Sequence, residues 1–246
     1  LRGFSAPVVL DFAYTDAQLR TLLANDPDPF NRWEAGQRLA LRSAIQSIAS
    51  DAGSTGAKPL NDEYLGAMRA VLRHPTLDAA FKELVLTLPS ETYIAEQLDV
   101  VDPQRIHAVR EAMRAQLATD LQADWQWAFE THQASGAYRP DATSAGRRAL
   151  AGMALSMLCL AAMQTGDTVW PGKALQRFKD AGNMTDRANA LQALVSSGHP
   201  LATNALTRFH ALFQREELVL DKWFAIQAGA PDKGAQVLPA VRQLLT

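Results

Sequence analysis

The sequence has a single cysteine, Cys159, among its 246 residues. One cysteine excludes an internal disulfide framework and a zinc site built on several thiolates. Its neighbours are apolar, so we expect the thiol to be buried and its pKa to be raised, which makes it a poor nucleophile. This cysteine usage fits a reducing compartment, and we expect a cytoplasmic location.

An excess of charge of one sign is also missing. Lys and Arg number 24 against 26 Asp and Glu, which gives a formal net charge of −2. The chain therefore has no general basic field that would attract nucleic acid or an anionic membrane. We expect neither as a partner.

The motifs of several enzyme classes are absent. None of the five histidines stands in an H-E-x-x-H arrangement, and the sequence contains no G-x-x-x-x-G-K-[ST] or G-x-G-x-x-G phosphate loop and no G-x-S-x-G elbow. These absences leave no motif for a free-standing hydrolase or a nucleotide-binding enzyme.

Three pairs of polar residues are the remaining candidates for a metal site or acid-base chemistry. They are His107 with Glu111, Asp120 with Asp124, and Glu216 with Glu217. The first pair alone leaves a metal short of ligands, and the two acidic pairs have no partner that the sequence can place beside them. We interpret all three as polar helix faces, and we assign no catalytic, cofactor-binding or metal-binding residue.

A long uncharged run stands out in what the sequence does contain. Residues 149–163 carry no charge and no polar face. A helix that is apolar on every side must be surrounded by other elements, and this run is shorter than the ~18 to 20 residues that cross a bilayer. The run therefore predicts a buried helix near the centre of a helical domain more than one layer thick, and no membrane span.

Most other segments also have helical periodicity, separated by Pro, Gly and capping residues. Residues 103–132 form the longest stripe, which we predict to be one long helix. No fixed period of ~30 to 45 residues is visible, so a regular solenoid of the TPR or ankyrin kind is not expected, and an irregular stack of helix pairs stays open. The predicted fold is all-α, an irregular α-α superhelical multi-helix domain.

The one convincing strand covers residues 5–14, with Pro7 near its start. A lone strand cannot form a sheet, so we expect its partners to belong to a preceding domain or another molecule. The chain also begins at Leu1 without an initiator Met. Both features predict a piece of a longer protein.

Aromatic residues are the last candidates for a binding site. The five tryptophans could stack on nucleic-acid bases, but such platforms need a basic groove beside them. We therefore expect helix packing for the tryptophans. In residues 221–224 (Asp-Lys-Trp-Phe) we expect the aromatic pair to face the core and the charged pair to face solvent or neighbours.

Several separate blocks, in order along the whole chain, resemble the C-terminal portion of bacterial aminopeptidase N. The blocks are residues 3–8 (Gly-Phe-Ser-Ala-Pro-Val), 30–37 (Phe-Asn-Arg-Trp-Glu-Ala-Gly-Gln), 86–91 (Leu-Thr-Leu-Pro-Ser-Glu), 183–186 (Asn-Met-Thr-Asp), 221–224, and 227–228 (Gln-Ala). The family comprises zinc alanyl aminopeptidases of the H-E-x-x-H class.

The resemblance implies a four-domain parent whose last domain is helical and packs against a thermolysin-like catalytic domain. Residues 1–15 would be the last strand of a preceding β-sandwich, and residues 16–246 the helical C-terminal domain, truncated at its C-terminus. The zinc motif, the third zinc ligand and the groups that hold the substrate would lie outside this chain. The resemblance therefore implies zinc in the parent and none in this fragment.

Two functions follow as hypotheses. The first is a non-catalytic fragment of an aminopeptidase that encloses the active site and limits the access of peptide substrates. Its partners would be the catalytic domain of the parent chain and, in the parent, the peptides. The alternative is an independent helical adaptor for protein-protein interaction.

Overall fold

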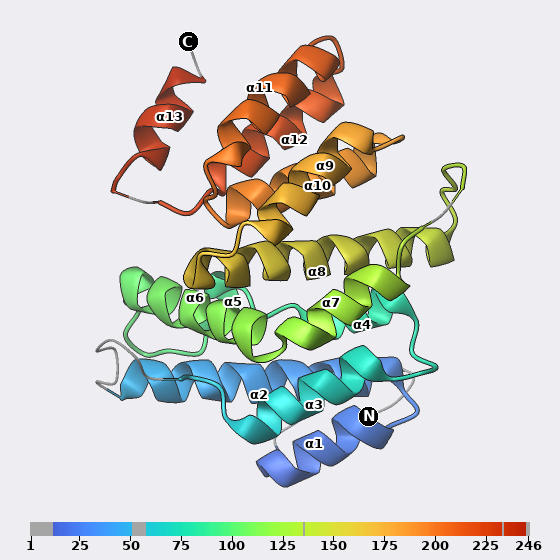
Figure 1. Cartoon of the computed structure of the whole chain (residues 1–246). Helices are drawn as coiled ribbons and strands as arrows, with labels where there is room; N and C mark the ends of the chain where they lie inside the picture. Colours follow the sequence, from blue (N-terminus) through green and yellow to red (C-terminus); the bar gives the residue numbers. More distant parts are fainter. Residues whose placement is uncertain (1–11, 51–57, 135, 233, 245–246) are drawn as a thin grey trace. The chain divides into compact units, whose positions relative to one another are not determined.

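The computed structural model describes residues 12–50, 58–134, 136–232 and 234–244. Its regular elements in these ranges are all α-helices (Figure 1). They are α1 (Asp16–Asn25), α2 (Pro29–Ala49), α3 (Asp62–Arg73), α4 (Ala79–Leu86), α5 (Glu91–Ala95), α6 (Pro103–Asp120), α7 (Gln122–Thr131), α8 (Ala142–Thr165), α9 (Val169–Asp180), α10 (Met184–Ser196), α11 (Leu201–Phe213), α12 (Glu217–Ala228) and α13 (Val237–Gln243). The all-α prediction is confirmed for the described residues.

Local capping fixes where many of these helices begin. Thr15 and Gln18 form a capping box at the start of α1, with each side chain bonded to the backbone N–H of the other residue. Side chains at the N-caps of seven other helices likewise accept hydrogen bonds from the first turn of their helix. These caps are Asp28, Asn61, Asp78, Ser90, Asp102, Asp141 and Asn183. Each cap satisfies N–H groups that the helix itself leaves unpaired.

The predicted strand at residues 5–14 lies almost entirely in residues 1–11, outside the described part of the chain. Phe12, Ala13 and Tyr14 are described, and they have no strand conformation. The strand over the preceding residues stays a prediction.

The prediction of one long helix over residues 103–132 is wrong. The helix is interrupted at Leu121, where φ is −112° and ψ is 21°, so α6 ends at Asp120 and α7 starts at Gln122. Leu121 is itself fully buried, and buried residues continue on both sides of it, such as Leu117 and Trp125. A break of one residue leaves the apolar stripe intact, and for this reason the spacing did not reveal it.

The chain divides into two compact units, residues 1–124 and 125–246. In the first unit, α2 packs against α1, α4, α5 and α6, and α3 packs against α1 and α4. Its core consists of large apolar side chains from these helices that are almost inaccessible. Examples are Leu23, Met68, Leu72, Leu86 and Leu117.

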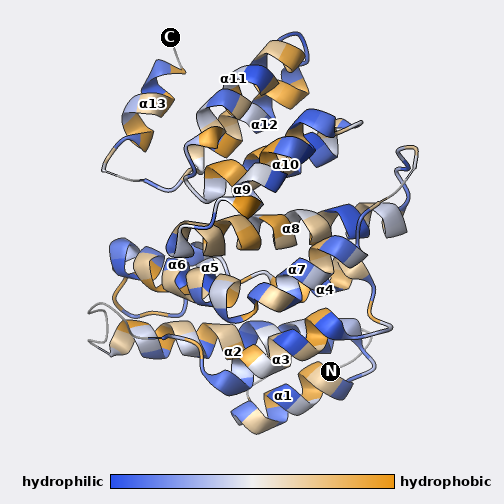
Figure 2. Cartoon of the chain, in the orientation of Figure 1, coloured by the Kyte–Doolittle hydropathy of each residue, from blue (hydrophilic) through white to orange (hydrophobic). Residues whose placement is uncertain are grey.

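The second unit is built on α8, which packs against α9 and α10. Leu150, Leu155, Leu158 and Cys159 of this helix are fully buried, so the predicted buried helix is confirmed. Apolar residues cover most of its length, and polar residues gather at its N-terminal end (Figure 2). The remaining helices form a packed series, with α11 against α9, α10 and α12, and α13 against α12.

At 24 residues, α8 is longer than its uncharged run and long enough to cross a membrane by length and composition alone. It is the one such helix in the described residues, and 56% of its most apolar window is buried inside the protein. Packing against α9 and α10 accounts for its apolar character without lipid.

Candidate functional site

A polar cavity of about 720 Å³ opens in the second unit. It is lined by the segment between α7 and α8, the first turns of α8, the end of α9 and the start of α10. Its charged lining residues are Arg139, Arg147, Arg148, Arg177, Asp180 and Asp186. We call this the arginine cavity.

Arg148 is the most enclosed of these residues, at 4% exposed. Its guanidinium carbon lies 4.5 Å from the centre of the Tyr138 ring, and its Nη2 donates a hydrogen bond to the Arg139 carbonyl oxygen at 2.8 Å. The carbonyl oxygen of Arg148 in turn accepts a hydrogen bond from Asn189 of α10 at 3.2 Å. Arg148 thereby connects the wall of the cavity to the α8–α10 core.

Arg147 and Arg177 hold the chain that leads from α7 to α8. Arg147 Nη2 donates to the carbonyl oxygens of Thr131, at 3.0 Å, and Gln133, at 3.2 Å. Arg177 donates through Nη1 to the Gln133 side-chain oxygen and through Nη2 to Asp186 Oδ1, the latter at 3.1 Å. These contacts fix one side of the cavity to α8 and α9.

Two helix N-termini lie beside the cavity. Asn183 caps α10 by accepting a hydrogen bond from the Asp186 N–H, and its side chain donates to Asp186 Oδ2 at 2.8 Å. Asp141 caps α8 by accepting hydrogen bonds from the backbone N–H and the hydroxyl of Ser144. These bonds, the backbone one first, hold the pKa of the Asp141 carboxyl below its usual value.

The first predicted pair, His107 and Glu111, does not form a shared site. His107 Nδ1 lies 2.8 Å from Glu91 Oε1, whereas Glu111 pairs with Arg114 at 2.6 Å. The interpretation of this pair as surface polar residues is consistent with these separate partners.

In the second predicted pair, Asp120 and Asp124, both carboxylates have defined partners in the folded chain. Asp124 is only 7% exposed, and its two carboxylate oxygens accept hydrogen bonds from Arg69 Nε at 2.9 Å and Arg73 Nε at 2.7 Å. The interpretation as a solvated helix face is therefore wrong for Asp124. The sequence did not reveal these contacts, because the two arginines lie in α3, more than fifty residues away.

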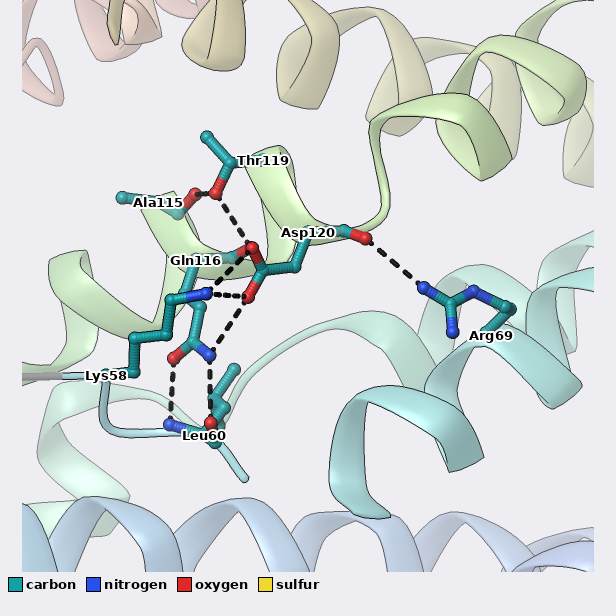
Figure 3. A network of polar contacts seen from close by, with 7 residues as sticks. All are labelled: Lys58, Leu60, Arg69, Ala115, Gln116, Thr119 and Asp120. Atoms are coloured by element: carbon teal, nitrogen blue, oxygen red, sulfur yellow. Dashed lines mark hydrogen bonds and ion pairs between the residues drawn. The ribbon is translucent and has the colours of Figure 1, made fainter. Parts of the chain in front are cut away.

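Asp120, the other member of this pair, belongs to a network that ties α6 to the segment before α3 (Figure 3). Its carboxylate lies 3.1 Å from Lys58 Nζ and accepts a hydrogen bond from Gln116 Nε2. The Gln116 amide exchanges two hydrogen bonds with the backbone of Leu60, of 2.9 and 2.8 Å, and Arg69 reaches the Asp120 carbonyl oxygen at 3.3 Å. This network has a structural role that the sequence did not reveal.

The other candidates also take structural positions. Glu216 and Glu217 are exposed at the start of α12. Cys159 is fully buried, and its burial raises the pKa of the thiol to about 12, with a smaller effect from Asp167. The prediction of a buried thiol is confirmed, and its lack of reactivity stays a prediction.

Packing explains the tryptophans. Trp125 and Trp170 are buried, and Trp223 Nε1 donates a hydrogen bond to the Leu206 carbonyl oxygen at 2.9 Å, which joins α12 to α11. In residues 221–224 the charged pair is exposed as expected, but Phe224 is 39% exposed. Trp223 is half-buried, and the prediction of a core-facing aromatic pair is wrong for Phe224.

Comparison with known proteins gives a family for this architecture. Residues 16–246 match the family described as a domain of unknown function (DUF3458_C) with ARM repeats. The chain belongs to this family.

The DUF3458_C domain is also similar to aminopeptidase N of three bacteria. It is 35% identical to the Caulobacter vibrioides protein over 235 residues, 34% to the Escherichia coli protein over 243 residues, and 32% to the Haemophilus influenzae protein over 232 residues. These matches cover 96%, 98% and 94% of this chain but only 26%, 27% and 26% of the relatives. The chain thus spans about a quarter of these relatives, and it corresponds to their C-terminal region, which confirms the resemblance seen in the sequence.

A solved structure has the same fold as the DUF3458_C domain. Aminopeptidase A of Legionella pneumophila, in complex with aspartic acid, superposes with a TM-score of 0.79 at 26% identity, over 98% of this chain and 28% of that one. The helical arrangement is therefore shared with a second aminopeptidase.

A zinc ion needs three or four His, Cys, Asp or Glu ligands at one point. Over the described residues of the DUF3458_C domain, no three such side chains come together in that way. His107 with Glu91 is a pair only, and Cys159 is enclosed by apolar packing. These residues do not fit the zinc that the aminopeptidase relatives imply, and we derive no chemistry through a metal here.

Proposed function

We propose that this chain is the non-catalytic helical C-terminal region of a zinc-dependent aminopeptidase that removes N-terminal residues from peptides. The observation that carries this proposal is the 34% identity to Escherichia coli aminopeptidase N over 98% of the chain, which is 27% of that relative. In this proposal the zinc and the groups that act on the peptide bond belong to other parts of the longer protein.

The proposed role is steric. The region would pack against the catalytic domain and enclose the active site, so that thin peptides and free N-termini enter while folded proteins are kept out. Exposed apolar side chains on the last helices support an interdomain contact of this kind. They include Leu212 at 50%, Leu218 at 81% and Leu238 at 58% exposed.

An exchange of regions in the Escherichia coli relative tests this role. One variant lacks the region that matches this chain, and a second carries this chain in its place. We expect the second variant to cleave short alanyl peptides and to spare peptide N-termini attached to folded proteins. We expect the first either to lose activity or to lose this discrimination. Equal discrimination by both variants would contradict a steric role.

A second experiment tests whether the isolated 246-residue chain is non-catalytic. With zinc present, it should release no chromophore from an alanyl amide substrate, while circular dichroism shows the helical fold. Peptidase activity that stays proportional to the amount of this chain through repeated purification would contradict the proposal.

The adaptor hypothesis has one observation in its favour, since ARM repeats stack helix pairs into superhelices with extended concave surfaces. We propose the irregular α-α superhelical arrangement for this chain on the same ground. The sequence of the complete gene product separates the two functions. An upstream H-E-x-x-H motif supports the aminopeptidase, and a start codon just before Leu1 supports the adaptor.

Compartment is a further part of the proposal. The single cysteine, Cys159, suits a reducing environment, and we propose that the protein acts in the cytoplasm.

A further inference from the structure

The arginine cavity differs in charge from the chain as a whole. The chain has a formal net charge of −2, whereas the cavity is lined by four arginines and two aspartates, an excess of two positive charges. The arginines come from three separate segments: Arg139 precedes α8, Arg147 and Arg148 lie in its first turns, and Arg177 lies in α9. Their convergence requires the folded unit.

Several guanidinium N–H groups in the cavity have no partner within the described residues. Arg139 makes no hydrogen bond or salt bridge with those residues, although its charge acts on the nearby Asp141 carboxylate, while Arg147 and Arg148 each bond through Nη2. Arg148 lines the cavity, and its side chain bonds to the described residues through Nη2 alone. A guanidinium binds oxyanions through two parallel N–H groups.

The acidic residues restrict which anion fits. Asp186 is already paired with Arg177 and Asn183. Asp180 is exposed, and its Oδ2 accepts a hydrogen bond from Gln176 at 2.7 Å. Its carboxylate would repel a phosphate dianion and would accept hydrogen bonds from N–H groups of a ligand. The lining therefore suits a molecule with one carboxylate and several N–H groups.

We propose that the arginine cavity binds the carboxylate of an amino acid or a short peptide. Arg139, Arg147 and Arg148 hold the carboxylate, and Asp180 accepts from an amine or amide N–H of the same molecule. The volume of about 720 Å³ lies in the usual range for small-ligand sites. This proposal does not rest on the proposed aminopeptidase function, because binding can be measured with no catalytic domain present.

Calorimetric titration of the 246-residue chain tests the site with four probes: trialanine, trialanine amide, alanine and inorganic phosphate. We expect trialanine to bind at least about tenfold more tightly than its amide, since a hydrogen bond to a charged group is worth ~1.5 to 3 kcal/mol. The alanine titration shows whether the carboxylate comes from a free amino acid or from a peptide. Equal binding of alanine assigns the site to amino acids, and tighter binding of trialanine assigns it to peptides.

Variants locate the binding. Arg139→Gln should weaken trialanine binding about tenfold, with no loss of fold because the side chain is exposed and has no bonding partner among the described residues. Arg147→Gln is a second, independent variant. The matched control is Arg208→Gln, an exposed arginine of α11 in the same unit that does not line the cavity.

Three results would overturn the proposal. They are equal binding of trialanine and its amide, tighter binding of phosphate than of trialanine, and equal losses in the Arg139→Gln and Arg208→Gln variants. Circular dichroism of each variant keeps a loss of binding separate from a loss of structure.

Discussion

Asp124 shows at the residue scale how a side chain at the start of a helix can organise its surroundings. Its side chain is 10% exposed, and it bonds to Arg69 and Arg73 on successive turns of α3. Because the two arginines are 50% and 39% exposed, water screens part of the attraction. The contribution to stability is therefore smaller than that of a fully buried ion triad.

We predict that Asp124→Asn lowers the free energy of unfolding by about 1 to 2 kcal/mol, because neither arginine keeps a charged acceptor at this position. Urea unfolding followed by circular dichroism measures the change. The control is Glu34→Gln, which removes a single i,i+4 pair with Arg38 and should cost less than about 0.5 kcal/mol. An equal effect of the two substitutions would show that the double pairing adds nothing.

Cys159 gives a second prediction at this scale. Burial raises the pKa of its thiol to about 12, so at pH 8 the reactive thiolate is nearly absent in the folded chain. The same burial keeps any thiol-specific reagent away from the sulfur. A colorimetric disulfide reagent should detect no thiol in the native protein and one per chain in urea. Fast reaction of the native protein would contradict the burial of this residue.

At the element scale, the packing of α8 against α10 depends on a small residue. A Cβ added at Gly152 would lie 2.7 Å from Asn189 Nδ2 and 2.9 Å from Asn189 Cγ. Asn189 Nδ2 donates to the Arg148 carbonyl oxygen at 3.2 Å, so the side chain cannot move away without loss of that bond. Helix α8 therefore keeps a glycine in its interior despite the low helix propensity of glycine.

We predict that Gly152→Ala destabilises the wild-type chain by about 1 kcal/mol, although alanine is the better helix former. In the Asn189→Ala background the same substitution should stabilise by about 0.5 to 1 kcal/mol. Gly172→Ala is the control, because a Cβ at that helical position meets no atom within 4 Å. Thermal unfolding measures all four variants, and stabilisation by Gly152→Ala alone would refute the close approach.

At the scale of the whole molecule, the chain is an ARM-repeat domain that matches about a quarter of its aminopeptidase relatives. Within each of its two compact units, the helices are held by apolar packing and by polar contacts, such as those of Asp120 in the first unit and Arg177 in the second. In the described part of the chain, no group of three His, Cys, Asp or Glu side chains could hold a metal ion. Its fold is therefore expected not to depend on zinc.

We predict that removal of metal with a chelator shifts the thermal unfolding midpoint of the chain by less than ~1 °C, since a structural metal would contribute folding free energy directly. Metal analysis after dialysis should find less than roughly 0.1 zinc per chain. A large shift on chelation, reversed by added zinc, would mean that the chain holds a metal after all.

Features that depend on neighbours a few residues apart were predictable from the amino-acid sequence. The caps at Thr15, Asn61 and Asp141 bond to N–H groups three residues later, so their pattern was readable along the chain. The buried position of α8 followed from its lack of charge, since such a helix must be covered. The family resemblance was also visible at this level.

Features that join distant segments became visible in the folded chain. Asp124 meets arginines 55 and 51 residues away, and the arginine cavity draws its lining from residues 134–186 across three helices and two connecting segments. The break at Leu121 likewise leaves the apolar spacing unchanged. Sequence periodicity records which face of a helix is buried, but it carries no record of which distant side chain or carbonyl completes a contact, because chain folding alone brings those groups together.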